Sequence, residues 1–296
     1  MKWNPFNHKI GLALGGGGAK GIAHIGVIKA FEENDIEISY LSGTSIGALV
    51  ASYYAFGKSV DDIRRISSGL IFTSLIGLSI PKKGIFSTKS IKDMILNDLG
   101  DVNIEDANIP LAICTSDIMS GEQVVFRKGS LADAVCASIA VPGIFIPVEI
   151  NGRTLVDGGI TENVPVSPLD VMGAGITVAI NLNGITSYPE PKDLIAIMGN
   201  AIDIAIDLRT REQLKKADVT LSLDLGRFSR FGNTDEFDKL YKQGYSLAKS
   251  KISKLFWFKR VRYFFYLKQL ISNILPFKIP RVLQIRKICR TKIAKD

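Results

Sequence analysis

Short apolar runs alternate with helix-like stretches through residues 10–225, and this alternation limits the possible folds more than any other feature of the sequence. The runs read as strands, and they cover residues 10–14, 38–42, 110–116, 123–127, 176–182 and 219–225. Helical patterns lie between them, for example over Lys20–Asn34, Ile46–Phe56, Thr88–Leu99 and Leu131–Ile139. Such alternation predicts an α/β sandwich with a largely parallel sheet, and Asn151-Gly152 predicts one tight hairpin turn.

The composition favours a globular chain without a metal centre. With 296 residues, 46% of them hydrophobic, the chain is long enough for one or two domains with a sizeable core. Three scattered cysteines make a disulfide framework improbable, and no His/Cys cluster predicts a metal site. No window of about 18 apolar residues lacks charge, so no membrane span is expected. We interpret the N-terminal run IGLALGGGGAKG as a strand and a loop rather than a signal peptide.

The strongest local motif is GTSIG, Gly43 to Gly47, which lies between a strand-like run and a helix-like run. A nucleophile elbow requires this strand–turn–helix setting. The two glycines let the backbone turn tightly and leave the Ser45 hydroxyl exposed, above a helix N-terminus that favours developing negative charge. We predict that Ser45 is a nucleophile; the alternative is a serine in an ordinary β–α turn.

A glycine-rich loop, GGGGAKG from Gly15 to Gly21, follows the first strand. Its backbone N–H groups can bind a phosphate or a tetrahedral oxyanion. The loop also fits the dinucleotide motif GxGxxG, which requires an acid at the end of the second strand. Here Ser45 follows that strand and Glu37 lies at its beginning. Acyl chemistry is therefore favoured over nucleotide binding.

The histidines are too few and too early for an ordinary triad. Only His8 and His24 exist, and both precede Ser45, whereas the histidine of an α/β-hydrolase follows its serine. We expect His24 to be a packed structural residue. The best remaining base is Asp157, which ends a strand-like run before Gly158-Gly159. A carboxylate can accept the serine proton when burial makes it more basic.

Together these motifs resemble those of the patatin-like phospholipases, most closely the small bacterial members. GGGAKG (16–21) resembles that family's oxyanion-hole motif, GTSIG (43–47) its nucleophile elbow, and DGG (157–159) its catalytic aspartate motif. The order of the motifs is the same. The flanking stretches KGIAHIGVIKAFEE and ASIAVPGIFIPV are also similar. The resemblance covers about residues 10–182.

The resemblance implies a three-layer α/β/α sandwich and a hydrolase that cleaves carboxylic esters of (lyso)phospholipids or related lipids. Ser45 would form an acyl-enzyme, and Asp157 would act as general base and then as general acid. The N–H groups of Gly16, Gly17 and Gly18 would form the oxyanion hole. The motif would be supported by Lys20, Gly21, Gly43, Gly47, Gly158 and Gly159. No calcium, other metal or cofactor is implied.

The C-terminal segment lies beyond the resemblance and is strongly basic. Residues 249–296 hold 14 Lys and Arg residues and one acid, a net charge of +13. Because the whole chain has a net charge of +8, the other residues together carry −5. Hydrophobic residues recur at helical spacing in this segment, among them Trp257, Phe264 and Ile271. This pattern predicts a helix at the interface of an anionic membrane. The alternative is packing on the hydrolase core; nucleic acid is not expected.

These features predict a hydrolase domain over residues 10–226, with its motifs in 10–182, and a C-terminal helical region over 227–296. Residues 70–86 are apolar without a clear period, and we interpret them as a connection packed on the core or a lid that meets lipid. We expect a cytoplasmic protein, or one bound peripherally to the inner face of the cell membrane, with a lipid ester as substrate. The alternative function is a non-hydrolytic membrane-associated regulator.

Overall fold

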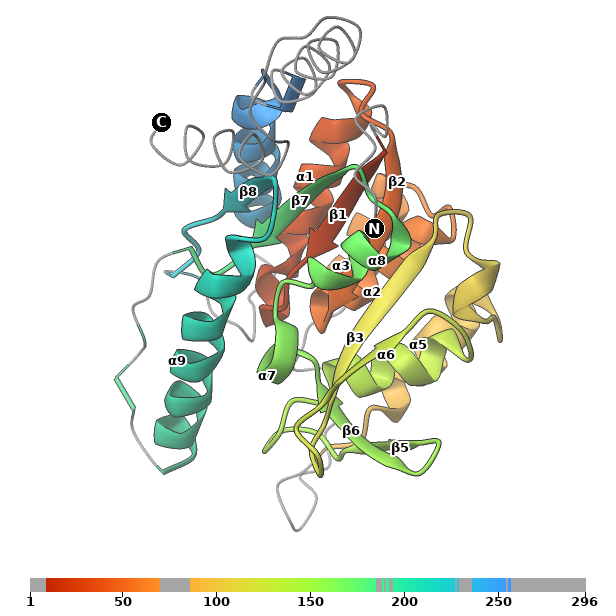
Figure 1. Cartoon of the computed structure of the whole chain (residues 1–296), viewed down its shortest axis with the longest axis vertical. Helices are drawn as coiled ribbons and strands as arrows, with labels where there is room; N and C mark the ends of the chain where they lie inside the picture. Colours follow the sequence, from red (N-terminus) through yellow and green to blue (C-terminus); the bar gives the residue numbers. More distant parts are fainter. Residues whose placement is uncertain are drawn as a thin grey trace, which may run out of the picture.

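The computed structural model describes residues 9–69, 86–184, 188, 190–191, 194–226, 228, 236–253 and 255–256, which form three layers (Figure 1). Two predictions made above therefore fall mostly outside the described residues. The possible lid over 70–86 is described only at Phe86, and the tail is described only as far as residue 256. Within the described ranges, no helix combines the length and the apolar character needed to cross a membrane.

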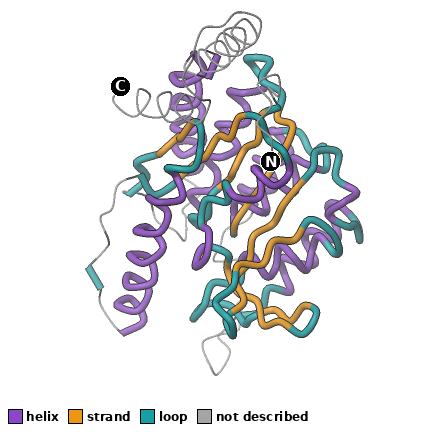
Figure 2. The backbone as a smooth tube through the Cα atoms, in the orientation of Figure 1, coloured by secondary structure: helices purple, strands orange, loops and turns teal. Residues whose placement is uncertain are grey.

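An eight-stranded sheet forms the middle layer of the described chain (Figures 1 and 2). Its strands are β1 (Ile10–Leu14), β2 (Ile38–Thr44), β3 (Leu111–Asp117), β4 (Gln123–Phe126), β5 (Val148–Ile150), β6 (Arg153–Asp157), β7 (Ile176–Asn181) and β8 (Val219–Ser222). Their order is β5-β6-β3-β2-β1-β7-β8, and β4 pairs with β3. From β3 to β8 all neighbours are parallel, whereas β4, β5 and β6 are antiparallel additions. The predicted α/β class with a largely parallel sheet is confirmed.

Helices cover both faces of this sheet, which confirms the three-layer arrangement. They are η1 (Gly18–Gly21), α1 (Ile22–Glu32), α2 (Ile46–Ala55), α3 (Val60–Gly69), α5 (Lys89–Leu99), η2 (Ile104–Asp106), α6 (Leu131–Ile139), α7 (Gly159–Glu162), α8 (Ser167–Met172), α9 (Leu194–Leu214) and a helix over 236–253. Alternate residues of a strand point to opposite faces. Leu12 and Leu14 accordingly join the larger core cluster with α1 and α2, whereas Ala13 packs with Leu169 of α8. Because both faces are buried, β1 is apolar throughout.

The predicted tight turn joins β5 to β6. Asn151 has φ 52° and Gly152 has φ 72°. Positive φ at both central residues is the requirement of a type I′ hairpin turn, which Asn-Gly meets best. After this hairpin, β6 pairs antiparallel with β3, and Asp157 lies opposite Thr115.

The helix over 236–253 packs against α1 with no side chain between the two backbones. A Cβ on Gly26 of α1 would lie 2.1 Å from the carbonyl oxygen of Tyr241, and a Cβ on Gly244 would lie 1.9 Å from that of Ala23. Leu240 and the neighbouring apolar residues of this helix belong to the main core cluster. The helix is therefore part of the same folded body as the sheet.

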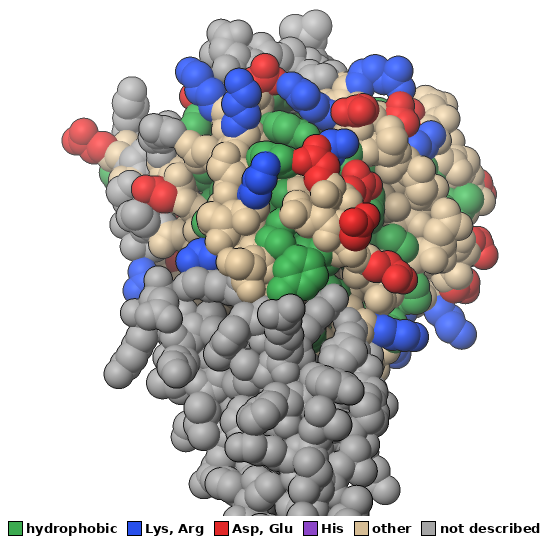
Figure 3. Space-filling model, turned by 90° about the horizontal axis from the view of Figure 1, so that it is seen from above, with side chains coloured by type: hydrophobic (Ala, Val, Ile, Leu, Met, Phe, Trp, Pro, Cys, Tyr) green, Lys and Arg blue, Asp and Glu red, His purple; other side chains and the backbone are tan. Residues whose placement is uncertain are grey.

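The first residues of the predicted tail also pack on this body. Ile252 and Leu255 are 7% and 2% exposed and belong to the main core cluster. Elsewhere the described surface carries charges of both signs. In the view from above, basic and acidic side chains lie around a strip of hydrophobic ones (Figure 3). This face of the described body therefore presents no field of a single sign.

Candidate active site

The predicted nucleophile and base lie on either side of β3. Ser45 directly follows β2, and Asp157 is the last residue of β6. Cys114 of β3 pairs with Thr44, and the next residue, Thr115, pairs with Asp157. Ser45 and Asp157 therefore flank β3 at the same level of the sheet. The glycine loop after β1 reaches this edge as well, because β1 is parallel to β2.

Ser45 has a backbone conformation that is costly for a residue with a side chain. Its φ is 56° and its ψ is −128°, and conformations of this kind cost about 1–3 kcal/mol. The two motif glycines allow this sharp turn by close backbone contact. A Cβ on Gly43 would lie 2.5 Å from Cα of Ala48, and a Cβ on Gly47 would lie 2.1 Å from the carbonyl oxygen of Leu14. The arrangement has the geometry of a nucleophile elbow.

Ser138 of α6 holds the elbow in place, and the sequence analysis did not identify it. The backbone N–H of Ser45 donates to Oγ of Ser138 at 2.8 Å. That hydroxyl in turn donates to the carbonyl oxygen of Cys114, at 2.7 Å. The hydroxyl thus links α6, the elbow and β3. A serine inside an apolar helix gives no signal in the sequence that would reveal this contact.

The glycine loop lies directly beside the nucleophile. A Cβ on Gly16 would lie 3.3 Å from Cβ of Ser45. The N–H of Gly16 already donates to the backbone carbonyl of Asn163, at 3.1 Å. The N–H groups of Gly17 and Gly18 donate to no group of the described chain. Of the three predicted oxyanion donors, the second and third therefore have no acceptor among the described residues.

The remaining residues of the loop are packed rather than exposed. Lys20 is 6% exposed and lies in η1, and a Cβ on Gly21 would lie 2.3 Å from Cγ1 of Ile46. A small apolar cavity of about 30 Å³ lies beside them. Its lining includes Ala19, Gly21, Ile22, Ile46, Leu49 and Phe237. Ile46 follows Ser45 in the chain, so this cavity lies along the helix that begins at the elbow.

Asp157 is held at the end of β6 by the glycines that follow it. The carboxylate is 7% exposed, and its Oδ1 accepts the N–H of Gly159 at 2.7 Å. A Cβ on Gly158 would lie 2.3 Å from the carbonyl oxygen of Cys114, so only glycine fits there. The DGG motif therefore sets both the path of the chain and the orientation of the carboxylate.

Asn163 is a further residue of this region that the sequence analysis missed. It is 5% exposed, and its Oδ1 lies 2.7 Å from the Cβ position of Gly16 and 3.4 Å from that of Gly159. Its Nδ2 is buried without a hydrogen-bond partner in the described chain. Leaving such a donor unpaired costs about 1–3 kcal/mol and is rare in folded proteins. An Asn before Val-Pro is typical of an ordinary turn, so no sequence signal distinguishes it.

His24 is a structural residue, as expected. It is fully buried, and its Nε2 lies 2.8 Å from the carbonyl oxygen of Gly15, to which it donates as the neutral tautomer. Burial lowers the pKa of His24 to about 4, against a smaller opposing effect of this hydrogen bond. The imidazole is therefore uncharged at neutral pH and supports the start of the glycine loop.

The low pKa of His24 predicts a specific loss of stability in acid. In the unfolded chain its pKa is about 6.5, so the unfolded state binds this proton first and stability falls with pH between about 6.5 and 4. From pH 7.5 to pH 5 the loss should be roughly 2 kcal/mol. We expect His24→Gln, which can keep the hydrogen bond, to lack this part of the slope in urea denaturation at both pH values. An unchanged slope would contradict the assignment.

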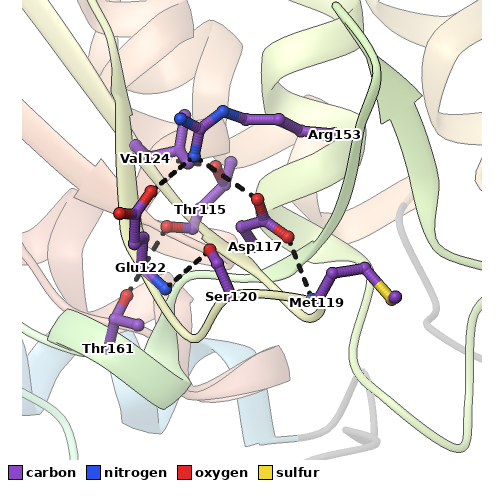
Figure 4. Close-up of polar contacts among 8 residues, drawn as sticks. All are labelled: Thr115, Asp117, Met119, Ser120, Glu122, Val124, Arg153 and Thr161. Carbon is purple, nitrogen blue, oxygen red and sulfur yellow. Dashed lines mark hydrogen bonds and ion pairs between the residues drawn. The ribbon is translucent and has the colours of Figure 1, made fainter.

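An ion-pair network joins the turn between β3 and β4 to β6 (Figure 4). Arg153 of β6 lies 2.9 Å from Glu122 and 3.3 Å from Asp117. The Asp117 carboxylate also accepts the N–H of Met119 at 2.9 Å, while the Met119 side chain points away and is 81% exposed. The network thus ties the turn to the strand that carries Asp157.

Among the described residues, no cluster of three or more His, Cys, Asp or Glu side chains could hold a metal ion.

Comparison with known proteins identifies related chains. An uncharacterised NTE-family protein of Mycobacterium tuberculosis is 38% identical over 184 residues, which are 61% of this chain and 51% of that protein. Lysophospholipase NTE1 of Yarrowia lipolytica is 33% identical over 184 residues, 60% of this chain but 13% of that protein. The chain thus spans about half the length of the first relative and a small part of the second.

The fold and the motifs are shared with proteins of one family. The crystal structure of VipD from Legionella pneumophila superimposes with a TM-score of 0.52 at 20% identity, over 82% of this chain and 67% of that one, and supports the fold. The family model described as patatin-like phospholipase matches residues 12–170, which include the glycine loop, Ser45 and Asp157. The chain belongs to the patatin-like phospholipase family.

Proposed function

We propose that this chain hydrolyses carboxylic esters of lysophospholipids or related lipids, with Ser45 as nucleophile and Asp157 as general base. The observation that carries the proposal is the strained backbone of Ser45, φ 56°, at a strand–helix junction beside a glycine loop with unbonded N–H groups. Strain at a non-glycine residue persists only where the surrounding structure enforces it, and it is common at active sites.

The proposed reaction has two steps. Oγ of Ser45 attacks the ester carbonyl carbon while Asp157 accepts the hydroxyl proton, and the negative charge that develops on the carbonyl oxygen is bound by the N–H groups of Gly17 and Gly18. The alcohol then leaves with the proton from Asp157, and an acyl-enzyme remains. In the second step, water attacks the acyl carbon while Asp157 accepts its proton; the bond to Oγ of Ser45 then breaks, Asp157 returns the proton to Oγ, and the fatty acid is released.

A lipid substrate is supported by two independent features. The relatives of the chain include proteins named lysophospholipases, from Yarrowia lipolytica and Emericella nidulans. A small apolar cavity is lined by Ile46 and Leu49 of α2, the helix that begins directly after Ser45, so apolar surface lies close to the proposed site. A polar ester would gain nothing from this surface.

Covalent labelling and a lipid panel test the proposal together. We expect a fluorophosphonate probe to label the wild-type chain at Ser45, and we expect fatty acid release from lysophosphatidylcholine, phosphatidylcholine or monoacylglycerol vesicles. Ser45→Ala should lose both. Equal labelling of the two proteins would refute the nucleophile. A folded wild type that releases no fatty acid from the panel would favour the non-hydrolytic regulator instead.

The basic tail is proposed to bring the chain to anionic membranes. Residues 257–296 hold 11 Lys and Arg residues and one acid, a net charge of +10. Each basic residue near an anionic lipid surface contributes about 1 kcal/mol at moderate salt. The membrane proposal is restricted to the residues after 256, because Ile252 and Leu255 are buried in the core. This association would make the protein peripheral on the membrane.

Deletion of residues 257–296 tests this role. The full chain should sediment with phosphatidylglycerol vesicles but not with phosphatidylcholine vesicles, and high salt should weaken the binding. The shortened chain should stay in the supernatant and keep its hydrolysis of a short dispersed ester. Undiminished binding after the deletion would remove the tail from the membrane contact.

A further inference from the structure

The glycine loop has fewer available donors than its sequence suggests. Because the N–H of Gly16 donates to the backbone carbonyl of Asn163 at 3.1 Å, Gly17 and Gly18 keep the two unbonded N–H groups of the predicted three. An oxyanion hole works by aiming preorganised donors at the oxygen on which charge develops, and side-chain amides serve as such donors as well as backbone N–H groups. The described side chains around the loop include one with an unused donor, that of Asn163.

Oδ1 of Asn163 lies close to two glycine positions, one that neighbours the nucleophile and one that neighbours the base. The Cβ position of Gly16 is 2.7 Å from its Oδ1 and 3.3 Å from Cβ of Ser45. The Cβ position of Gly159 is 3.4 Å from the same Oδ1 and 3.0 Å from Oδ1 of Asp157. The amide therefore fills the space that glycine leaves open at both positions. Larger residues at either position would displace it.

The side chain of Asn163 is not needed for the structural contact that this residue makes. Its backbone carbonyl, which any residue would provide, accepts the N–H of Gly16. Its Nδ2 is buried and unpaired in the described chain, although the residue as a whole is 95% shielded from water, with 5% exposed. Buried donors are normally satisfied, so an unpaired one in a side chain that contacts the glycine loop is consistent with a partner that arrives with the substrate.

We infer that Nδ2 of Asn163 is a third oxyanion donor, which hydrogen-bonds the ester carbonyl oxygen as it becomes negatively charged. This assignment rests on the proposed esterase function and adds a residue to that site. No atom is transferred to or from Asn163. Its contribution is a neutral hydrogen bond that strengthens as charge develops, so it acts on the transition state more than on substrate binding.

Two variants of Asn163 distinguish a donor from a structural residue. Asn163→Ala should lower kcat about 10²–10³-fold with little change in KM, as loss of one oxyanion donor does. Asn163→Asp keeps the size and Oδ1 of the side chain but replaces the donor by an acceptor. If Nδ2 is a donor, the aspartate variant should be at least as slow as the alanine variant. If the side chain is structural, the better-fitting aspartate should be the more active of the two.

Binding of a trifluoromethyl ketone provides a second readout, because its adduct with Ser45 places an oxyanion in the hole. Its affinity should fall in both variants by about the same factor as kcat/KM, while the affinity for a non-hydrolysable ether lipid stays unchanged. Gln213→Met is the control: its amide donates to the carbonyl of Thr161 at 2.9 Å, beside α7, so its loss should lower the melting temperature without this effect on kcat.

The outcomes separate the two claims. A wild type with normal turnover and an Asn163→Ala variant within about threefold of it would overturn the donor assignment alone. The same holds if Asn163→Asp is clearly faster than Asn163→Ala, or if affinity for the ketone is unchanged. A wild type without labelling or turnover would overturn the esterase proposal, and the Asn163 assignment with it. If the alanine variant does not fold, the kcat and ketone affinity of the isosteric aspartate variant decide.

Discussion

Asp157→Asn is expected to lower ester hydrolysis by about 10²–10⁴-fold while the protein stays folded. The asparagine side chain cannot accept the proton of Ser45, so the hydroxyl remains a weak nucleophile. Its Oδ1 can still accept the N–H of Gly159, which bonds the wild-type carboxylate at 2.7 Å. We therefore expect an almost unchanged melting temperature. Fatty acid release per minute, measured beside the thermal transition, checks both parts.

Asp117→Asn is the matched control for this variant. Asp117 is a second shielded carboxylate at the same end of the sheet, 6% exposed, and it pairs with Arg153 rather than with any group of the proposed reaction. Its replacement should leave kcat within a few-fold of wild type. Retained turnover in Asp157→Asn, or an equal loss in both variants, would exclude Asp157 as the base.

Gly47→Ala is expected to destabilise the fold by about 3 kcal/mol or more, although it adds a single methyl group. The added Cβ would lie 2.1 Å from the carbonyl oxygen of Leu14 and 2.7 Å from that of Gly15. Both atoms belong to the backbone at the end of β1, so relief requires α2 to move away from the sheet. Because Ser45 directly precedes α2, fluorophosphonate labelling should fall as well.

Gly199→Ala gives the opposite result and serves as its control. Gly199 lies in α9, and a Cβ there would meet nothing within 4 Å. Alanine in an open helix position stabilises by up to about 1 kcal/mol relative to glycine. Urea denaturation of the two variants should therefore give shifts of opposite sign. A Gly47→Ala protein as stable as the wild type would contradict the close contact between α2 and β1.

The sequence predicted the sheet and the sharp strand–helix turn at Ser45 well, because the signals for both are local. β1 is apolar throughout since both of its faces are covered, and the run 10–14 matches the strand from end to end. The predicted hairpin at Asn151-Gly152 follows from the positive φ that this pair tolerates. Gly43 and Gly47 likewise stand where backbone atoms approach within 2.5 Å of a Cβ position.

The contacts that complete the site could not be predicted, because they join residues far apart in the chain. Ser138 reaches the N–H of Ser45 across 93 positions, and its hydroxyl bond depends on how α6 packs on β3. The hydrogen bond from the N–H of Gly16 to the carbonyl of Asn163 likewise depends on where the turn after α7 lies. A motif shows which backbone groups are exposed by glycine, but not which of them are already bonded.

The glycine contact between α1 and the helix over 236–253 affects where further segments can be attached in larger relatives of this chain. The family match ends at residue 170, yet Gly244, which lies well beyond it, is in direct backbone contact with α1, where Gly26 lies. Trimming the chain at 226 would expose the surface of α1 that this helix covers, so we expect the smallest stable hydrolase to extend past residue 253. A protein segment attached after this helix would be oriented relative to Ser45 by the contact between the helix and α1. No side chain separates the two backbones at this contact, so side-chain movement cannot adjust it. Exchange of such segments between homologues should therefore succeed only where both glycines are kept.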